Sequence, residues 1–356
     1  MADMRSRLGI NLAQQGNLIF LLYFGIFAAS LVVGPLIDYI GNGANLLASS
    51  LLVLVSMLMF AAAHSFLVAG IGAVLLGLGG GGLNTCTNVL VSELYGEKRG
   101  PMLNLLGIFF GIGALCIPLL AASIQGHFTT SQVFIFCSVL SAACAIAYAV
   151  ISFPPPAQKH AFSLRDTFAV AMYPGVLLLG FILFFESGNE ACIAGWTSTY
   201  AASSGFAPRA ATLALASYWG SLMLSRIAAA GALKTLGKRQ LVLIAAVGSF
   251  IGCSILLSAN SLALLFAGTA LIGFSYGPIF PTTLAIAGDR YPNLTGTVFG
   301  LLFSIALVGG MLMPVAVGQV SQRTDVRRGM IMPFFGAIAI CTLAAIVKWR
   351  DRRQNH

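Results

Sequence analysis

The sequence predicts an all-α integral membrane protein with eleven transmembrane helices. Charged residues make up only 8% of its 356 residues, whereas soluble domains contain roughly 25%. Hydrophobic residues make up 58%, and the mean hydropathy is +0.93. The apolar residues form eleven runs, each near the ~20 residues that a helix needs to cross a bilayer. Membrane β-strands are excluded, because they are short and alternate between apolar and polar residues.

The apolar runs fall into two groups separated by a proline-rich segment. Residues 153–165 read FPPPAQKHAFSLR, and the prolines stop a helix there. We therefore predict an N-terminal bundle over residues 1–152, a cytoplasmic linker over 153–166 and a C-terminal bundle over 167–356. The predicted spans are 14–38, 45–63, 66–92, 102–125 and 131–152, then 168–201, 208–232, 240–258, 261–287, 294–320 and 329–349. Two helical halves around a central cavity are typical of secondary transporters.

The basic residues predict how the chain lies in the membrane. They are scattered through short connectors, so the net charge of +9 forms no face for nucleic acid. One side of the eleven-helix arrangement carries thirteen bases and the other carries six, which places the first side and the C-terminus in the cytoplasm. We expect a multi-pass protein of the plasma membrane, here the bacterial inner membrane. The six discordant bases are Arg5, Arg7, Arg209, Arg323, Arg327 and Arg328.

Enzymes and metal proteins are not indicated. The histidines lie near loops and far apart along the chain, so they predict neither a metal site nor a Ser-His-Asp arrangement. The seven cysteines lie within predicted spans without metal-ligand or disulfide spacing, and we interpret them as packing residues. The run Gly79 to Gly82 lacks the Lys-Ser or Lys-Thr of a phosphate loop. We predict no cofactor, no metal and no enzymatic activity.

Two carboxylates mark the predicted functional site. Glu186 and Glu190 lie inside the apolar stretch Phe181 to Tyr200 and are four residues apart, so a helix places them on one face. A carboxylate within a bilayer is costly and usually functional. We predict that they line a cavity where protons or polar ligands bind. The alternatives are a structural carboxylate bonded to a neighbouring helix for Glu190 and a position near the external interface for Glu186.

Other polar residues of the spans are candidate ligands for a solute. Trp196 follows Glu190 by six residues, and an aromatic face beside polar groups suits a sugar; an interfacial tryptophan is the alternative. Asn84 and Asn88, one turn apart, can bind hydroxyls or bond between helices. Tyr276 precedes Pro278 and Pro281, which either free backbone carbonyls toward a cavity or kink the helix for packing.

Several segments resemble the major facilitator superfamily, in particular its fucose-permease-like and sugar-porter-like members. They are NLLGIFFGIGALCIPLL from Asn104, GNEACIAGW from Gly188, YWGSLMLSR from Tyr218 and GFSYGPIFPTTLA from Gly273, in the order of that family. The resemblance implies substrate binding by Asn104 and sugar hydrogen bonding or proton relay by Glu190. It also implies that Arg226 lies near the cytoplasmic gate, although snorkelling to lipid headgroups explains its position equally well.

A further segment, GPLIDYIG from Gly34 to Gly41, is similar to the loop motif after the second helix of that superfamily. Asp38 is then its gating acid. The family usually adds basic residues, where this chain has Tyr39, Asn42 and Gly43. In this alignment the first run of the chain corresponds to the family's second helix, so the family's first helix is absent. We expect either a truncated chain or a natural eleven-helix protein.

The combined observations predict a secondary active transporter for a small polar solute, most specifically a sugar or polyol, which works by alternating access. The expected partners are the solute, a proton or sodium ion for coupling, and the lipid bilayer. The resemblance implies a functional monomer. A multidrug or metabolite exporter of the same superfamily and a non-transporting membrane protein are the alternatives.

Overall fold

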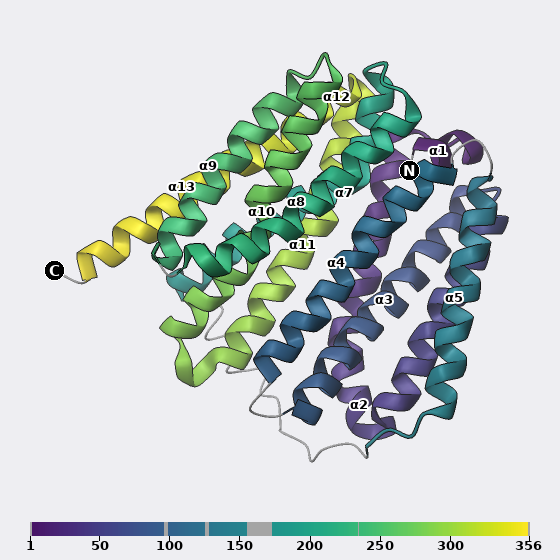
Figure 1. Ribbon diagram of the computed structural model, residues 1–356, viewed down its shortest axis with the longest axis horizontal. Coiled ribbons are helices and arrows are strands. Elements are labelled where there is room, and N and C mark those ends of the chain that lie inside the picture. The colour runs from purple at the N-terminus through teal and green to yellow at the C-terminus, as the bar shows by residue number, and fades with distance from the viewer. Residues whose placement is uncertain (1, 96–98, 125–127, 155–172, 234, 355–356) are drawn as a thin grey trace. The chain divides into compact units, whose positions relative to one another are not determined.

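The computed structural model describes residues 2–354 apart from 96–98, 125–127, 155–172 and 234. Long α-helices dominate the described chain (Figure 1). The chain divides into two compact units. The N-terminal unit comprises Ala2–Gly113 and Ser123–Ala161, and the C-terminal unit comprises Ala114–Ala122 and Phe162–His356. Most of the predicted proline-rich linker, from residue 155 onward, lies outside the described residues.

The N-terminal unit contains four long helices and one short one. They are α1 (Ala2–Leu8), α2 (Leu12–Ala62), α3 (Phe66–Tyr95), α4 (Arg99–Ile124), whose residues Ala114–Ala122 are grouped with the C-terminal unit, and α5 (Thr130–Val150). The 51 residues of α2 form two segments that meet at Gly41, whose φ of 79° favours glycine. The first segment runs parallel to α3, because Leu21 lies against Gly70 and Ala29 against Gly81. The second runs antiparallel to α3, because Phe60 lies against Gly72 and Ser49 against Gly82. The chain therefore turns back at Gly41, and α2 supplies two membrane-crossing segments.

The C-terminal unit contains six long helices. They are α7 (Pro174–Ser203), α8 (Pro208–Ala232), α9 (Lys238–Leu257), α10 (Leu262–Arg290), α11 (Thr295–Arg323) and α13 (Ile331–Gln354), with the short η2 (Pro292–Leu294) and α12 (Val326–Gly329) between the last of them. Helix α7 packs against α11 and α13, and α10 packs against α8 and α9. Together with the five crossing segments of the first unit, these six helices confirm the eleven-helix prediction.

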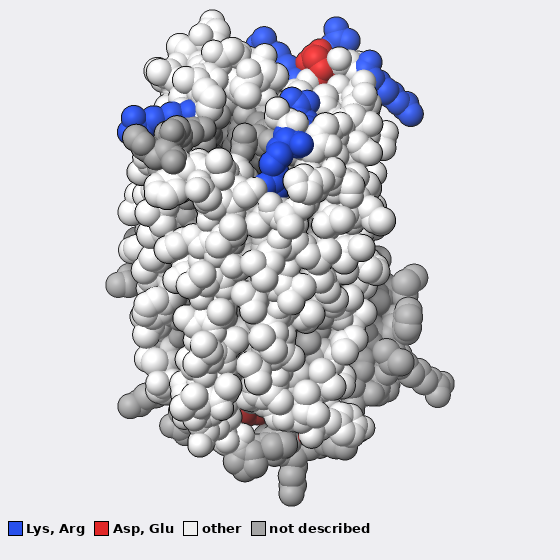
Figure 2. Space-filling view, turned by 90° about the vertical axis from the view of Figure 1, so that its right-hand side faces the viewer, with Lys and Arg blue, Asp and Glu red and all other residues white. Residues whose placement is uncertain are grey.

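The surface of the described helices suits a lipid environment. Eight helices are long and apolar enough to cross a membrane by length and composition, among them α2 with its two segments. Large hydrophobic side chains such as Phe136, Val150 and Ile227 are more than half exposed. Figure 2 shows a mostly uncharged middle on the face it presents, with Lys and Arg gathered toward its upper end. Apolar exposure on this scale marks a membrane-facing surface rather than a solvated one.

Glycines set the closest helix contacts in both units. A Cβ atom on Gly77 would lie 2.8 Å from Cα of Gly25 and would also overlap the carbonyl oxygen of Leu22, so α2 and α3 cross with their backbones in contact. A Cβ atom on Gly188 of α7 would lie 2.9 Å from the carbonyl oxygen of Gly309 in α11. Helices in lipid gain no hydrophobic drive from association, so such close packing is their main attraction.

The N-terminal segment closes one end of the first unit. Met4 and Ile10 are buried in a cluster with Leu18 and Phe60. The guanidinium of Arg7 donates to the carbonyl oxygen of Phe60 and to the hydroxyl of Ser131, and Ser131 itself donates to the carbonyl oxygen of Ala61 at 2.9 Å. Arg7 therefore joins the last turn of α2 to the first turn of α5 and satisfies carbonyl groups that a helix end leaves open.

We predict that Gly77→Ala lowers the stability of the protein, because its new methyl group overlaps backbone atoms of α2. Overpacking of this kind costs about 1–3 kcal/mol. The matched control is Gly80→Ala in the same helix, where a Cβ atom meets nothing within 4 Å. Thermal unfolding in detergent gives the unfolding temperatures of both variants. Equal unfolding temperatures for Gly77→Ala and Gly80→Ala would contradict the backbone contact.

Candidate functional site

Helix α7 positions both carboxylates in the interior of the C-terminal unit. Pro174 begins the helix at a position where its fixed φ suits the first turn, and the helix then runs unbroken for 30 residues. Glu186 lies on the buried face with 2% of its surface exposed, whereas Glu190 is half-buried. The hydroxyl of Ser187 donates to Oε2 of Glu186 at 3.3 Å. Within the described residues, neither carboxylate forms an ion pair.

Arg226 of α8 supplies a positive charge to this pair. Its guanidinium is close enough to act electrostatically on both Glu186 and Glu190, although no contact within 4.0 Å joins them. Its side chain is exposed within the unit. The sequence resemblance placed Arg226 at a gate, and the structure shows that its charge also reaches the carboxylates. The site therefore combines two acids and one base within membrane-crossing helices, where each charge is costly to leave without compensation.

Asn189 ties the same part of α7 to two other helices. Its side-chain Nδ2 donates to the hydroxyl of Tyr276 in α10 at 2.8 Å and to the carbonyl oxygen of Pro333 in α13 at 2.9 Å. The side chain is completely buried. A buried amide with directed hydrogen bonds fixes the helices that it joins, since a broken bond would leave a polar group unpaired.

The two aromatic candidates are buried inside the C-terminal unit. Trp196 has no exposed surface, and its indole Nε1 has no hydrogen-bond partner within the described residues. Tyr276 is 1% exposed and is engaged with Asn189. Helix α10 continues through Pro278 and Pro281, so the prolines do not end it. Neither ring is open to a solute in this arrangement, and their predicted role in binding stays a prediction.

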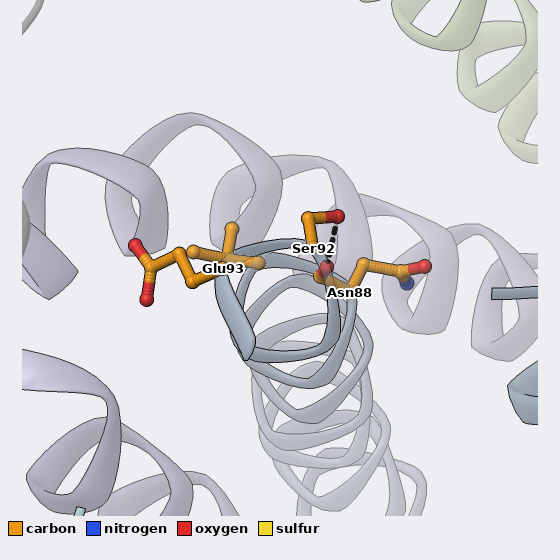
Figure 3. Close-up of a pocket in the computed structure, with 4 residues that line it drawn as sticks. Asn88, Ser92 and Glu93 are labelled. Carbon is orange, nitrogen blue, oxygen red and sulfur yellow. Dashed lines mark hydrogen bonds between the residues drawn. The ribbon is translucent and has the colours of Figure 1, made fainter. Parts of the chain in front are cut away.

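Asn88 of the N-terminal unit lines an open pocket and bonds to Asn84 one turn before it. Asn88 donates to the backbone oxygen of Asn84 at 2.7 Å and to its Oδ1 at 3.1 Å, and Ser92 donates to the backbone oxygen of Asn88 at 2.7 Å. The pocket measures about 390 Å³, and its described lining consists of Asn88, Val89, Ser92 and Glu93. Figure 3 shows Asn88 and Ser92 on one side of α3, while Glu93 points to the other side.

The turn after the first segment of α2 is held by an amide instead of a base. Asn42 donates to Oε2 of Glu93 at 3.2 Å and is itself buried. Asp38, the predicted gating acid, is half-buried and makes no ion pair with any described residue. Asn104 lies in α4, but its side chain falls outside the described part of the molecule. No group of metal-ligating side chains occurs among the described residues.

Comparison with known families identifies the fold. The model of the Major Facilitator Superfamily matches residues 1–184 and 176–356, which together span the whole chain. The chain belongs to this superfamily. The resemblance drawn from the sequence segments is thereby confirmed, as is the all-helical transporter fold. Members of this superfamily are transporters, and the described helices agree with a multi-pass membrane protein.

Two relatives and two solved structures are similar to this superfamily member. The uncharacterized transporter YfkL of Bacillus subtilis is 23% identical over 93% of this chain and 85% of its own, and sodium-dependent glucose transporter 1A of Mus musculus is 23% identical over 83% and 78%. The nucleoside transporter NupG has a TM-score of 0.80 at 14% identity, covering 98% of this chain and 93% of its own. A variant of the E. coli fucose:proton symporter FucP has a TM-score of 0.63 at 18% identity, covering 97% and 94%.

Three features of the site escaped the sequence analysis. Asn189 stands between Glu186 and Glu190 in α7, yet its partners lie 87 and 144 residues away. The approach of Arg226 to the carboxylates is equally non-local. The bond between Asn42 and Glu93 had a signal, because Asn42 occupies a place where the superfamily's loop motif usually carries a base. A neutral residue at that place predicts a hydrogen bond in place of an ion pair.

We predict that a water-soluble carbodiimide with an amine nucleophile modifies Glu190 several-fold faster than Glu186. The reason is access, because Glu190 is half-buried while Glu186 is 2% exposed. Peptide mass spectrometry of α7 measures the two positions within one sample, so each serves as the control for the other. Faster modification of Glu186 would contradict this difference in access.

Proposed function

We propose that this superfamily member is a secondary active transporter that moves a sugar or polyol across the plasma membrane by alternating access. The observation that carries the proposal is the arrangement in α7 and α8, where a half-buried Glu190, a buried Glu186 and the charge of Arg226 lie within membrane-crossing helices. Ionisable groups at such depth mark solute or ion pathways. The C-terminus is proposed to face the cytoplasm.

The pocket of the N-terminal unit supports a polar solute. Its described lining offers the amide of Asn88 and the hydroxyl of Ser92, which are neutral groups suited to hydroxyl ligands. A polyhydroxylated solute needs many directed hydrogen bonds, whereas a typical drug needs mainly apolar contact. The names of FucP, NupG and the glucose transporter all refer to sugars or to sugar-containing solutes, which favours the same class.

Glu190 is proposed to carry the coupling proton. A carboxyl group that is half-buried can exchange a proton with water and still lie within reach of the opposing charge of Arg226. The symporter FucP uses protons according to its name, while the glucose transporter is sodium-dependent. Sodium is therefore the second candidate ion, and comparison of uptake under a proton gradient and a sodium gradient distinguishes the two.

We predict that Glu190→Gln abolishes concentrative uptake but preserves exchange of labelled for unlabelled solute. The amide keeps the size of the side chain and removes the proton that links transport to the gradient. Proteoliposomes with an imposed proton gradient give the rate of concentrative uptake. Proteoliposomes loaded with unlabelled solute give the rate of exchange. Asp289→Asn is the control, because Asp289 is an exposed carboxylate paired with Lys238 at 2.6 Å. Accumulation by Glu190→Gln against a gradient would exclude proton coupling through this residue.

We also predict that a hexose, deoxyhexose or polyol raises the unfolding temperature of the purified protein. A ligand that binds only the folded state stabilises it by about 2.7 kcal/mol at one hundred times its dissociation constant. A panel of sugars, polyols, organic acids and drugs, tested at two pH values, defines the class. Stabilisation by drugs alone would replace the sugar proposal with a multidrug exporter.

A further inference from the structure

Asn189 lies at the point where three helices of the C-terminal unit meet. Both hydrogens of its Nδ2 are used, one by Tyr276 in α10 and one by the carbonyl oxygen of Pro333 in α13. Its Oδ1 is buried and has no hydrogen-bond partner within the described residues. A solute cannot reach this amide, because the side chain has no exposed surface. Its role must therefore be exerted through the helices that it joins.

Gly336 makes the room for this amide. A Cβ atom at residue 336 would overlap Oδ1 of Asn189 and would lie 2.7 Å from Nδ2 and 2.9 Å from Cγ. The carboxamide thus rests directly on the backbone of α13. Any side chain at position 336 would displace the amide while leaving every polar group of the network chemically intact. This contact offers a way to disturb the position of Asn189 without changing its chemistry.

The contacts of Asn189 define the rotation of α7 about its own axis. Successive residues of a helix are about 100° apart, so Asn189 points away from Glu190 and about one turn along from Glu186. Helix α7 also packs closely against α11 where Gly188 meets Gly309. Glycines have no side chain, so this contact includes no directed bond between side chains. A further hydrogen bond from α7 to another helix joins the hydroxyl of Tyr200 to the carbonyl oxygen of Leu256 in α9, eleven residues beyond Asn189.

We propose that Asn189 is a positioning residue, which holds α7 in the rotation that buries Glu186 and leaves Glu190 half-buried. Hydrogen bonds to α10 and α13 on one face of α7 oppose its rotation toward either neighbour. The inference rests on the proposed function insofar as the two carboxylates serve transport. The anchoring itself does not depend on which solute or ion is carried.

Cys192 is a natural reporter of this rotation. It lies three residues beyond Asn189 on the same buried face and is completely buried. In Asn189→Leu and in Gly336→Ala, reaction of Cys192 with a membrane-permeant maleimide in vesicles is expected to rise about tenfold, because the anchoring bonds are lost or displaced. Peptide mass spectrometry follows Cys192, with the equally buried Cys86 of α3 as an internal measure of global unfolding. Gly300→Ala in α11 is the matched control, since a Cβ atom there meets nothing within 4 Å.

Transport by the same variants tests whether the rotation matters. The KM for solute uptake is expected to rise about tenfold in Asn189→Leu and Gly336→Ala, because small misplacements of positioned groups have effects of this size or larger. Tyr276→Phe keeps the hydrogen bond from Asn189 to Pro333. Its KM is expected to lie between the KM of these variants and that of the wild type. A purely structural role would reduce the amount of folded transporter and the maximal rate without changing KM.

The outcomes separate the anchoring from the proposed function. Increased labelling of Cys192, an unchanged Cys86 and a raised KM together support the positioning role. Unchanged labelling of Cys192 in both variants overturns the anchoring, and increased labelling with an unchanged KM overturns the role in transport. If the wild type carries no sugar or polyol, the proposed function fails while the labelling experiment still decides the anchoring.

Discussion

The absence of water in the bilayer is the constraint on which this structure depends. Every backbone N–H and C=O group within the membrane needs an internal partner, and the α-helix satisfies them within one segment. Once the helices form, lipid gives them no hydrophobic reason to associate, so they must attract one another by close packing. Glycines provide that packing at the crossings of α2 with α3 and of α7 with α11. The need for internal hydrogen bonds explains the long helices of each unit. The need for close packing explains which helices lie against one another.

The same constraint explains how each unit treats its polar side chains. In the C-terminal unit, the amide of Asn189 is satisfied by Tyr276 and Pro333, and it locks three helices together. In the N-terminal unit, Asn88 instead bonds within its own helix and leaves the surrounding pocket open. Hydrogen bonds between helices make their arrangement rigid, whereas hydrogen bonds within one helix do not link it to its neighbours. The amides of Asn189 and Asn88 are therefore satisfied in different ways.

Few charged side chains lie in such an interior. Glu186 and Glu190 share one face of α7, and the nearest compensation comes from Arg226 of a different helix. No ion pair among the described residues neutralises either acid, and the charge of Arg226 acts on both from a neighbouring helix. A movement of α7 relative to α8 would change the electrostatic environment of each carboxyl group. The positioning of α7 by Asn189 and the proton carried by Glu190 are thus two parts of the same proposal.

Much of the architecture was accessible from the chain alone. Apolar runs of about bilayer length predicted eleven crossing segments, and the structure has five in α2 to α5 and six in α7 to α13. The segments GNEACIAGW and GFSYGPIFPTTLA indicated the superfamily that the comparison confirmed. The prolines of α10 were less informative, because they left open whether they free backbone carbonyls or kink the helix, and α10 continues through both.

Sequence by itself determined the helices, their number and the presence of two acids on one face of a membrane span, because these properties depend on hydropathy and on local helical geometry. Only the tertiary structure decided that Glu186 is buried while Glu190 is half-buried, that Trp196 and Tyr276 lie in the interior, and that Asn189 joins α7 to α10 and α13. Burial and pairing are properties of neighbours that lie up to 144 residues away in the chain, and the spacing of residues within one helix carries no information about them.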